Sequence, residues 1–347
     1  MRKQRLKEIA AGFPTARVAI VGDFFLDKYL DVDPEIEERS VETDKRAHQV
    51  VRVRHSPGAA GTVANNLVAL NAGEVHTVGC IGDDGEGFTL RRDLQRRGVD
   101  TGSLVVAAQR FTPTYLKPCD VGGGLKAEHE RYDTKNRTPT PPDVEDRIIA
   151  SVRDILPRVD ALIVSDQVEE EDCGVVTTRV REALNALAEE TEGVVFWVDS
   201  RRRIGAFRNM MVKPNGSEAI AAASEQADPA PPEERTAEWA AHLLRERTGR
   251  PVVVTLGSRG ALVCDRECAH VPGVFIEGPT DVTGAGDSAT AAAVLALVSG
   301  ASLVEAALVG NLAASITVQA LGTTGTASRE QLMDRLVLWL EQQGGKG

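Results

Sequence analysis

The chain has no apolar run long enough to cross a bilayer, and its N-terminus lacks the uninterrupted apolar core of a signal peptide. It also lacks an excess of basic residues: 51 Asp and Glu outnumber 40 Lys and Arg, which gives a net charge of −11. This charge balance argues against nucleic acid or an anionic membrane as the main partner. We therefore expect a cytoplasmic protein that binds a small molecule.

Cysteine is also scarce, and the five residues of this type are scattered along the chain. Cys264 and Cys268 are spaced like half of a metal site, but no second cysteine pair accompanies them. Reduced thiols with a structural role are the expectation for all five. Internal repeats and low-complexity tracts are absent, and a length of 347 residues suits one large domain or two ordinary ones.

Short apolar segments alternate with helical patterns over much of the chain. Residues 17–22, 160–165 and 193–198 are apolar and rich in β-branched side chains, which is typical of buried strands. Residues 143–157 and 173–189 have the spacing of amphipathic helices. This alternation predicts a parallel sheet with helices on both faces.

Other segments have a different pattern. Residues 48–54, 112–119 and 126–132 alternate apolar and polar side chains, as strands exposed on one face do. We expect them to form a small antiparallel sheet outside the main alternation, whereas residues 31–45 are interpreted as a loop. Such a flap can close over a substrate and exclude water, or it can be a dimerisation surface.

Carboxylates follow three of the predicted buried strands: Asp23, Asp166 and Asp199. Open α/β sheets bind ligands at the carboxyl ends of their strands, so these positions are candidate site residues. Asp27 is a candidate for binding ligand hydroxyls, and the alternative is a solvated turn. The arginines at 201–203 suit phosphate recognition or, alternatively, a solvated face.

Residues 278–300, GPTDVTGAGDSATAAAVLALVSG, carry the most informative pattern. A glycine turn leads into an apolar helix expected over 288–298, and the unpaired amides at such a helix start suit a phosphate or a developing oxyanion. Asp287 lies in the first turn, where a carboxylate can accept a proton from an attacking hydroxyl. The alternative is a plain turn with a helix-capping aspartate. The full string DVTGAGDS favours the catalytic interpretation.

The strings VGDFFLD, PGAAGTVANN, VGCIGDDGEG, ALIVSD, VKPNGSE and DVTGAGDS, in this order, resemble the pfkB/ribokinase family of carbohydrate kinases over essentially the whole chain. Within the family, the chain is most similar to the kinase half of bifunctional ADP-heptose synthases, which phosphorylate a heptose 7-phosphate. The resemblance implies a single domain over 1–347 with a ribokinase-like fold. This fold is a doubly wound, mostly parallel sheet with helices on both faces and a small β lid, here at about 28–55 and 110–135.

The resemblance also implies roles for individual residues. Asp287 would be the catalytic base, beside an anion hole formed by Gly284, Ala285 and Gly286. The residues expected at ATP are Lys213, Asn215, Glu218, Thr255, Gly257, Gly260 and Asn311. The residues expected at the acceptor are Asp27, Gly58, Asn66, Lys117, Asp166 and Arg201, with Lys117 and Arg201 as candidates for an acceptor phosphate. Glu218 would meet Mg²⁺, through water where it does not bind directly, and Asp281 and Thr283 match a loop that binds a monovalent cation such as K⁺.

Two positions depart from the pattern of the family. Thr62 replaces a usual asparagine, and Ser200–Arg201 replace the Pro-Lys that usually follows the strand-end aspartate in the heptose branch. We expect an ATP-dependent kinase of a sugar or sugar phosphate, with a heptose 7-phosphate favoured, that forms a homodimer through its lid and has no nucleotidyltransferase half. The alternatives are a kinase of nucleosides or other unphosphorylated alcohols and a non-catalytic sensor, although the retained Asp287 argues against a sensor.

Overall fold

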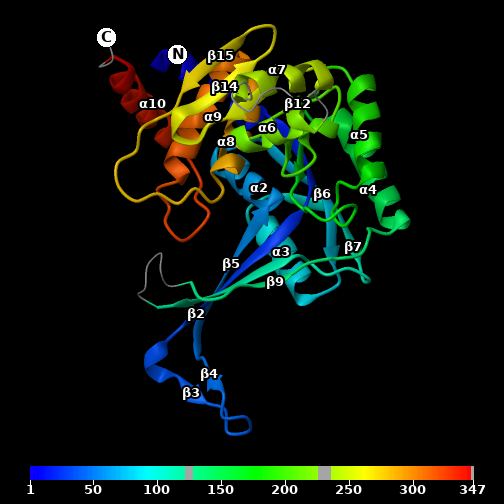
Figure 1. The fold of residues 1–347 in the computed structure, drawn as a ribbon, viewed down its shortest axis with the longest axis vertical. Coiled ribbons are helices and arrows are strands. Elements are labelled where there is room, and N and C mark those ends of the chain that lie inside the picture. Colours follow the sequence, from blue (N-terminus) through cyan, green and yellow to red (C-terminus); the bar gives the residue numbers. More distant parts are fainter. Residues whose placement is uncertain (122–127, 226–235, 345–347) are drawn as a thin grey trace.

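The computed structural model describes residues 1–121, 128–225 and 236–344, and it has an α/β body from which a thin β lid extends (Figure 1). Part of the predicted lid segment at 110–135 and most of the polar, proline-bearing loop at 224–234 lie outside the described residues. None of the described helices combines the length and the apolar character that a membrane crossing requires.

The body is built on a nine-stranded sheet in the order β15-β14-β13-β12-β11-β10-β1-β6-β7. Neighbours from β13 to β7 pair in parallel, which confirms the predicted parallel sheet, and only β14 and β15 complete one edge antiparallel. The sequence interpretation missed the edge strands β7 and β15, because edge strands have less continuous apolar character. The bounds are β1 Arg17–Gly22, β6 Glu74–Gly82, β7 Asp100–Ala107, β10 Ala161–Asp166, β11 Val195–Ser200, β12 Met211–Val212, β13 Val252–Thr255, β14 Gly260–Cys264 and β15 Cys268–Pro272.

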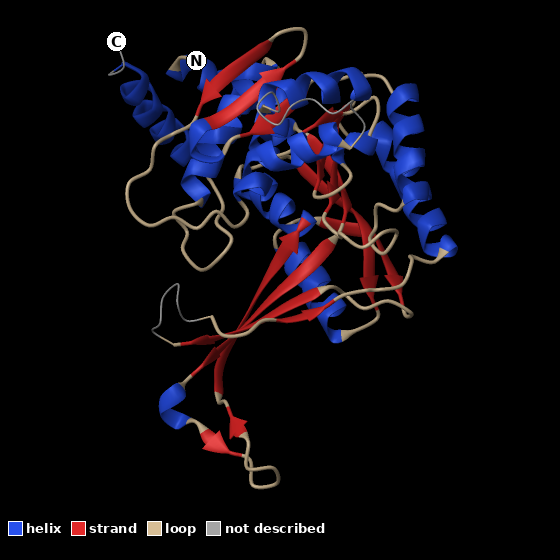
Figure 2. Ribbon diagram, in the orientation of Figure 1, coloured by secondary structure: helices blue, strands red, loops and turns tan. Residues whose placement is uncertain are grey.

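Helices cover both faces of this sheet, as predicted (Figure 2). Successive side chains of a strand point to opposite faces: Val18 and Ile20 pack in one apolar cluster, and Ala19 and Val21 pack in the other. The first cluster includes residues of α1 Lys3–Gly12, α2 Ala60–Ala69, α3 Gly85–Arg96, α8 Ala285–Val298, α9 Leu303–Thr317 and α10 Arg329–Gly344. The second includes residues of α4 Pro142–Ile155, α5 Thr178–Glu190, α6 Gly216–Ser224 and α7 Ala237–Thr248.

The lid is a four-stranded sheet in the order β5-β2-β8-β9. The prediction of a purely antiparallel flap is wrong, because β2 and β8 pair in parallel: β8 enters the lid from the body in the same direction as β2. The expected loop at 31–45 contains the end of β2, a short helical turn and one strand of a two-stranded ribbon, β3–β4. The bounds are β2 Phe24–Val32, β3 Glu38–Arg39, β4 Arg46–Ala47, β5 Val50–Ala59, β8 Thr114–Asp120 and β9 Tyr132–Thr134.

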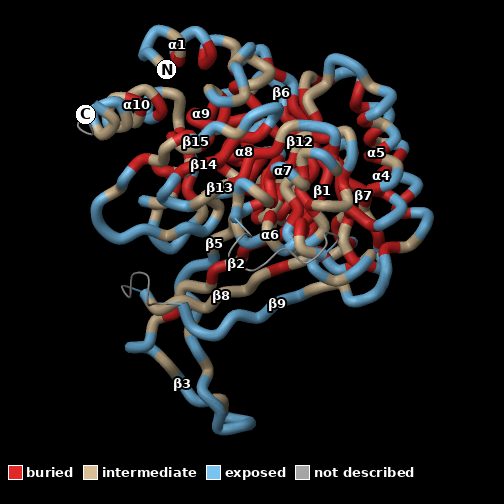
Figure 3. The backbone as a smooth tube through the Cα atoms, turned by 45° about the horizontal axis from the view of Figure 1, so that its top comes forward, coloured by how far each residue is buried: buried red, intermediate tan, exposed pale blue. Residues whose placement is uncertain are grey.

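Burial separates the two parts of the molecule clearly (Figure 3). The strands and inner helix faces of the body are buried, whereas most of the outer lid is exposed. Val51 and Val53 on β5 are 51% and 47% exposed. A sheet with one apolar face open to solvent commonly marks a contact surface.

The hairpin of β14 and β15 corrects the expectation for the cysteines. Cys264 and Cys268 face each other across the two strands and form a disulfide, so the prediction of five reduced thiols is wrong for this pair. The remaining three, Cys80, Cys119 and Cys173, are free. The pairing was missed because β15 was not predicted, and only its register places the two cysteines opposite each other.

Candidate active site

The loop before α8 turns sharply at Gly284, which has a left-handed φ of 77° and begins the helix as its N-cap. A Cβ at this position would lie 3.3 Å from the methyl groups of Thr62 and Thr324, so both the backbone and the packing require glycine. No side chain caps the first turn. The amide of Ala285 donates to the carbonyl of Val282, which leaves those of Gly286 and Asp287 as the next first-turn donors for an anion.

Asp287 lies in this first turn, on the floor of a cleft, and its environment disfavours the negative charge. Burial, aided by the nearby carboxylate of Asp199, raises the pKa of Asp287 to about 7, although Lys213 acts in the opposite direction. A general base works best when its pKa lies close to the working pH. The position and the pKa of Asp287 therefore both suit proton abstraction from a hydroxyl.

Lys213 forms a buried ion pair beside this loop. The parallel pairing of β11 with β12 aligns Val198 with Val212, so the next residues, Asp199 and Lys213, also lie side by side. Their Oδ2 and Nζ atoms are 2.8 Å apart. Burial opposes the charge of Lys213, but the attraction of Asp199 outweighs it and the pKa of Lys213 is raised. A Cβ on Gly286 would lie 3.5 Å from Nζ, so a permanent cation is held directly against the anion loop.

Asn215 and Glu218 begin α6 with a reciprocal capping box. Asn215 Oδ1 accepts from the amide of Glu218 at 2.9 Å, and Glu218 Oε2 accepts from the amide of Asn215 at 2.8 Å. Burial raises the pKa of Glu218, and Asp199 adds to this effect. The contacts in the structure are those of a helix cap, and the expected roles at nucleotide and Mg²⁺ stay predictions.

The other residues expected at the nucleotide surround the turn between β13 and β14. The amide of Thr255 donates to the carbonyl of Pro214 at 2.9 Å, which ties this turn to the start of α6. Gly257 and Gly260 have left-handed φ values of 61° and 96°. Asn311 on α9 donates its amide group to the carbonyls at the end of β15, so it supports this edge of the sheet, and its contact with adenine stays a prediction.

A cleft of about 520 Å³ lies between the lid and the body. Several residues that the sequence interpretation did not select also line it, among them Tyr115, Arg131 and Gln167. Arg131 stacks on the ring of Tyr115 at 4.3 Å, which holds its guanidinium at the lid. The predicted residues that line the cleft are Asp27, Gly58, Lys117, Arg201, Thr283, Gly284 and Asp287.

Asp27 and Lys117 form an ion pair in the wall of this cleft, with Oδ1 and Nζ 3.0 Å apart. Burial opposes the charge of Lys117, but Asp27 outweighs it, so the pKa of Lys117 is raised. A Cβ at Gly58 would lie 2.7 Å from Asp27 Oδ2, so glycine is needed to admit the carboxylate. The positive charge of Lys117 is therefore already matched by Asp27.

Two predicted acceptor residues do not line the cleft. Asn66 is fully buried and donates to the carbonyl of Thr62 at 3.0 Å. Asp166 is 1% exposed and accepts from the hydroxyl of Ser200 at 2.6 Å. Burial, with the nearby charge of Asp23, raises the pKa of Asp166 to about 6. In the structure both residues are bonded to neighbouring protein groups, and their direct contact with substrate stays a prediction.

The strand-end carboxylate of Asp23 also has a structural role. It is 3% exposed and accepts from the backbone amides of Gln167, Val168 and Val175. These bonds join the end of β1 to the segment after β10. Of the three strand-end carboxylates, Asp199 lies beside Asp287 and Lys213, whereas Asp23 lines a hollow of about 140 Å³ next to the cleft with its oxygens already bonded to these amides.

Two of the three consecutive arginines share a carboxylate, since Arg201 Nε lies 4.0 Å from Glu169 Oε1 and Arg202 donates to Glu169 Oε2. Arg201 lines the cleft, Arg202 contacts the exposed Glu169, and Arg203 is directed inward to Asp166 at 3.3 Å. Arg203 also donates to the carbonyls of Val168, Glu169 and Glu170. Only the first of the three is placed to meet a ligand, in agreement with the choice of Arg201.

Asp281 and Thr283 shape the loop expected to bind a monovalent cation. Asp281 accepts from the amides of Thr283 at 2.9 Å and Gly322 at 3.3 Å. Burial opposes its charge, but these bonds outweigh it and lower the pKa of Asp281. The loop is thus hydrogen-bonded to the turn at residues 321–326 (LGTTGT), and its binding of a cation stays a prediction.

The architecture just described, a doubly wound body with a β lid over a cleft, is the ribokinase-like fold. Ribokinase from Thermotoga maritima superposes with a TM-score of 0.65 at 21% identity, covering 92% of this chain and 99% of that one. Phosphofructokinase-2 from Escherichia coli, in complex with substrates and products, superposes with a TM-score of 0.69 at 21% identity, covering 93% and 99%. At this identity the likeness shows the fold.

The sequence places the chain more narrowly: it belongs to the pfkB family of carbohydrate kinases, whose profile matches residues 17–330. It is therefore a phosphotransferase with an alcohol group as acceptor. Two similar curated proteins are each named bifunctional protein HldE. That of Pelobacter propionicus is 31% identical and covers 95% of this chain, and that of Nitrobacter hamburgensis is 31% identical and covers 92%. The chain spans 65% and 63% of their lengths, respectively.

Proposed function

We propose that this kinase transfers the γ-phosphoryl group of ATP to a hydroxyl of a sugar phosphate, with a heptose 7-phosphate as the favoured acceptor. The observation that carries the proposal is the placement of Asp287. Asp287 has a pKa of about 7 and lines a cleft between the lid and the body. The first-turn amides of α8 and the cation of Lys213 lie beside it. A base, an anion site and a fixed cation are what in-line phosphoryl transfer needs, because its catalysis is mostly positioning and electrostatics.

The opposite wall of the cleft supports a phosphorylated acceptor. A hollow of about 140 Å³ shares Tyr115, Arg131 and Arg201 with the cleft and is also lined by Arg110 and Lys135. Arginine side chains bind phosphate oxygens through paired donors. A sugar whose reacting hydroxyl faces Asp287 would direct a phosphate at its far end toward the basic side chains of this hollow, whose lining also includes the carboxylates of Asp23, Glu169 and Glu170. The names of the HldE relatives agree with this class of acceptor, at about 30% identity.

The residues available to ATP and its metal ion fit their expected roles. Members of the pfkB family use ATP with Mg²⁺, which supplies positive charge to the transferred phosphoryl group. In this chain Glu218 and Asp199 are the carboxylates near Lys213, and their combined charge suits a divalent cation. We assign the loop of Asp281 and Thr283 to a monovalent cation. Phosphofructokinase-2 from Escherichia coli, of the same fold, has a structure in complex with potassium.

We also propose that the chain forms a homodimer through the lid. Val51 and Val53 on β5 are about half exposed, and Ile36 in the segment next to this strand is 51% exposed. A second copy that covers these side chains would remove apolar surface from water.

The decisive test replaces Asp287 with asparagine, which keeps the size of the side chain and removes the base. We expect phosphoryl transfer to fall by about 100- to 10,000-fold, while ATP still binds, as measured by calorimetry. Unchanged turnover would refute the mechanism. Loss of nucleotide binding together with turnover would assign Asp287 to binding and not to catalysis.

The acceptor is tested with a panel of sugars, sugar phosphates and nucleosides, using ADP release as the measurement. The proposal predicts the highest kcat/KM for a seven-carbon sugar phosphate and a marked loss when its phosphate is absent. Activity confined to nucleosides or unphosphorylated sugars would favour the alternative kinase. Tight binding of a sugar without any ADP release would favour a sensor.

A further inference from the structure

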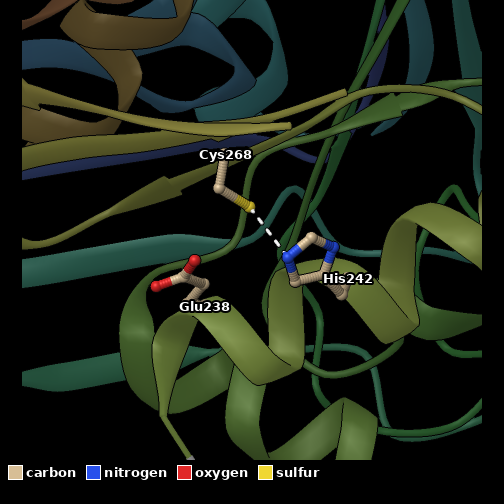
Figure 4. Close-up of side chains that lie close together, drawn as sticks. All are labelled: Glu238, His242 and Cys268. Atoms are coloured by element: carbon tan, nitrogen blue, oxygen red, sulfur yellow. Dashed lines mark hydrogen bonds between the residues drawn. The ribbon is translucent and has the colours of Figure 1, made fainter. Parts of the chain in front are cut away.

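Three side chains with metal-binding atoms meet where α7 contacts the β14–β15 hairpin (Figure 4). Glu238 and His242 are one helical turn apart on α7, so they share one face of the helix, and both point toward Cys268 at the start of β15. Their ligand atoms all lie within 4.8 Å of one another. Within 1–121, 128–225 and 236–344, this is the one such group of His, Cys, Asp and Glu.

The distance between two of these atoms matches a tetrahedral metal site. His242 Nε2 lies 3.5 Å from Cys268 Sγ. Zinc binds sulfur at about 2.3 Å and imidazole nitrogen at about 2.0 Å. Two such ligands at a tetrahedral angle are about 3.5 Å apart. The histidine and the cysteine are therefore already spaced as two corners of a zinc tetrahedron.

Cys264 supplies a fourth donor. The register of the hairpin places it directly opposite Cys268, to which it is joined by a disulfide. A dithiol reductant that gives two electrons and two protons to the bridge converts it to two thiols, and a divalent metal then displaces the two protons. Two thiolates, one imidazole and one carboxylate make four ligands of the kinds that zinc prefers.

The two elements that carry these ligands are held together independently of the ligands. Ala241 and Leu244 on α7 are buried in the same apolar cluster as Cys264. At the turn of the hairpin, Asp265 forms an ion pair with Arg245 of α7, with 3.5 Å between Oδ1 and Nη2. Folding of the body thus positions Glu238, His242 and Cys268 before any metal arrives, which lowers the cost of binding, and the reduced Cys264 has to turn from its bridged position to complete the site.

We propose that the reduced pair of Cys264 and Cys268, with His242 and Glu238, binds one zinc ion that clamps α7 to the β14–β15 hairpin. The disulfide and the metal are alternative states of one site, because the bridge uses the same two sulfurs. The site is separate from the residues of the cleft. It is nevertheless connected to the nucleotide side through the turn of Gly257 and Gly260, which joins β13 to β14.

The test uses the full chain, reduced with a phosphine, freed of metal with a chelator and titrated with Co²⁺ under anaerobic conditions. We expect one cobalt ion per chain, with a thiolate-to-cobalt charge-transfer band that disappears when Zn²⁺ is added. In metal sites, loss of a residue that only hydrogen-bonds to a metal ligand already lowers metal affinity by about 10- to 100-fold, and loss of a ligand itself should cost at least as much. His242→Ala and Cys268→Ser should therefore weaken binding at least tenfold, while Cys119→Ser, which removes a free thiol elsewhere, should change nothing.

The proposal is overturned if the reduced wild-type chain gives no charge-transfer band. It is also overturned if His242→Ala and Glu238→Gln bind cobalt as tightly as the wild type. Both of these side chains are exposed, so their replacement should leave the fold intact, which circular dichroism and the unfolding temperature will verify. The disulfide form, prepared by oxidation with diamide, should bind no cobalt, and undiminished binding by that form would equally contradict the proposal.

Discussion

Within residues 1–121, 128–225 and 236–344, the body and the lid each contain one largely buried lysine–aspartate pair, and the two pairs differ in their structural surroundings. In the body, Lys213 and Asp199 follow adjacent parallel strands, 2.8 Å apart, with helices on both faces of the sheet. In the lid, Lys117 and Asp27 are 3.0 Å apart on β8 and β2 of a sheet whose outer part is exposed. In both pairs the attraction of the carboxylate outweighs burial and raises the pKa of the lysine.

This difference indicates that the two regions have different roles in the reaction. The body pair lies against the anion loop and affects the pKa of Asp287, so it bears on the chemical step. The lid pair lines the acceptor side of the cleft, so it bears on binding. A rigid core suits the groups that must not move during catalysis, whereas a thin sheet suits a cover that opens for substrate.

Among changes to the two ion pairs, the largest effect is expected from Lys213→Met, which removes the buried cation and keeps the length of the side chain. Asp199 and Asp287 then lose their shared counter-charge, and we expect kcat to fall by about 100- to 1000-fold. Steady-state kinetics measures the loss. Lys28→Met, which breaks the more exposed pair with Glu86, is the control and should keep nearly full activity. A similar loss in both variants would erase the proposed difference between the regions.

The second prediction concerns pH. Because Asp287 must be ionised to accept a proton and has a pKa of about 7, kcat/KM should fall about tenfold per pH unit below that value. Lys213 lowers the pKa of Asp287, so in Lys213→Met the bend in the plot of kcat/KM against pH should move to higher pH. An unchanged bend would mean that another group controls the profile.

The same pKa has a consequence for stability. A carboxyl whose pKa is raised by folding stabilises the native state below its unfolded value near 4, and this contribution is lost as the pH rises through about 7. Asp287→Asn should therefore raise the unfolding temperature more at pH 8 than at pH 5. Thermal unfolding at the two pH values measures the difference, and equal shifts would contradict the raised pKa.

A smaller effect is expected from Lys117→Met in the lid. It leaves Asp27 without its partner and disturbs the acceptor wall, so KM for the acceptor should rise by about tenfold, which corresponds to about 1.4 kcal/mol. The value of kcat and the KM for ATP should change much less. A loss in kcat as large as that of Lys213→Met would show that the lid pair also acts in the chemical step.

The smallest effect on turnover is expected from Val51→Glu combined with Val53→Glu. Charges at these positions of β5 should prevent association of the lids, so light scattering should report a monomer where the wild type is a dimer. Surface changes of this kind usually cost less than about 0.5 kcal/mol, so activity per chain should stay within about twofold. A monomeric wild type would refute the proposed lid dimer, and a large loss of turnover would show that the partner's lid completes the site.

Much of the fold could be predicted from the sequence, because the buried parallel strands are short apolar runs between amphipathic helices. The edge strand β15 and the parallel pairing inside the lid could not, since both depend on which strand lies beside which. Among the three consecutive arginines, the sequence interpretation selected Arg201, which lines the cleft, and its contact with a phosphate stays a prediction. Arg131 was missed because nothing in the sequence separates it from a solvated charge on the lid.

The sequence by itself determined the chemical end of the cleft. In DVTGAGDS the turn, the helix start and the carboxylate are neighbours along the chain, so their geometry follows from local backbone rules. Only the tertiary structure decided which strand-end carboxylate is available, since Asp23 is bound by three amides whereas Asp199 lies beside Lys213. It also brought His242 to Cys268 from another element. Contacts between distant segments depend on strand register and helix packing, which no local pattern encodes.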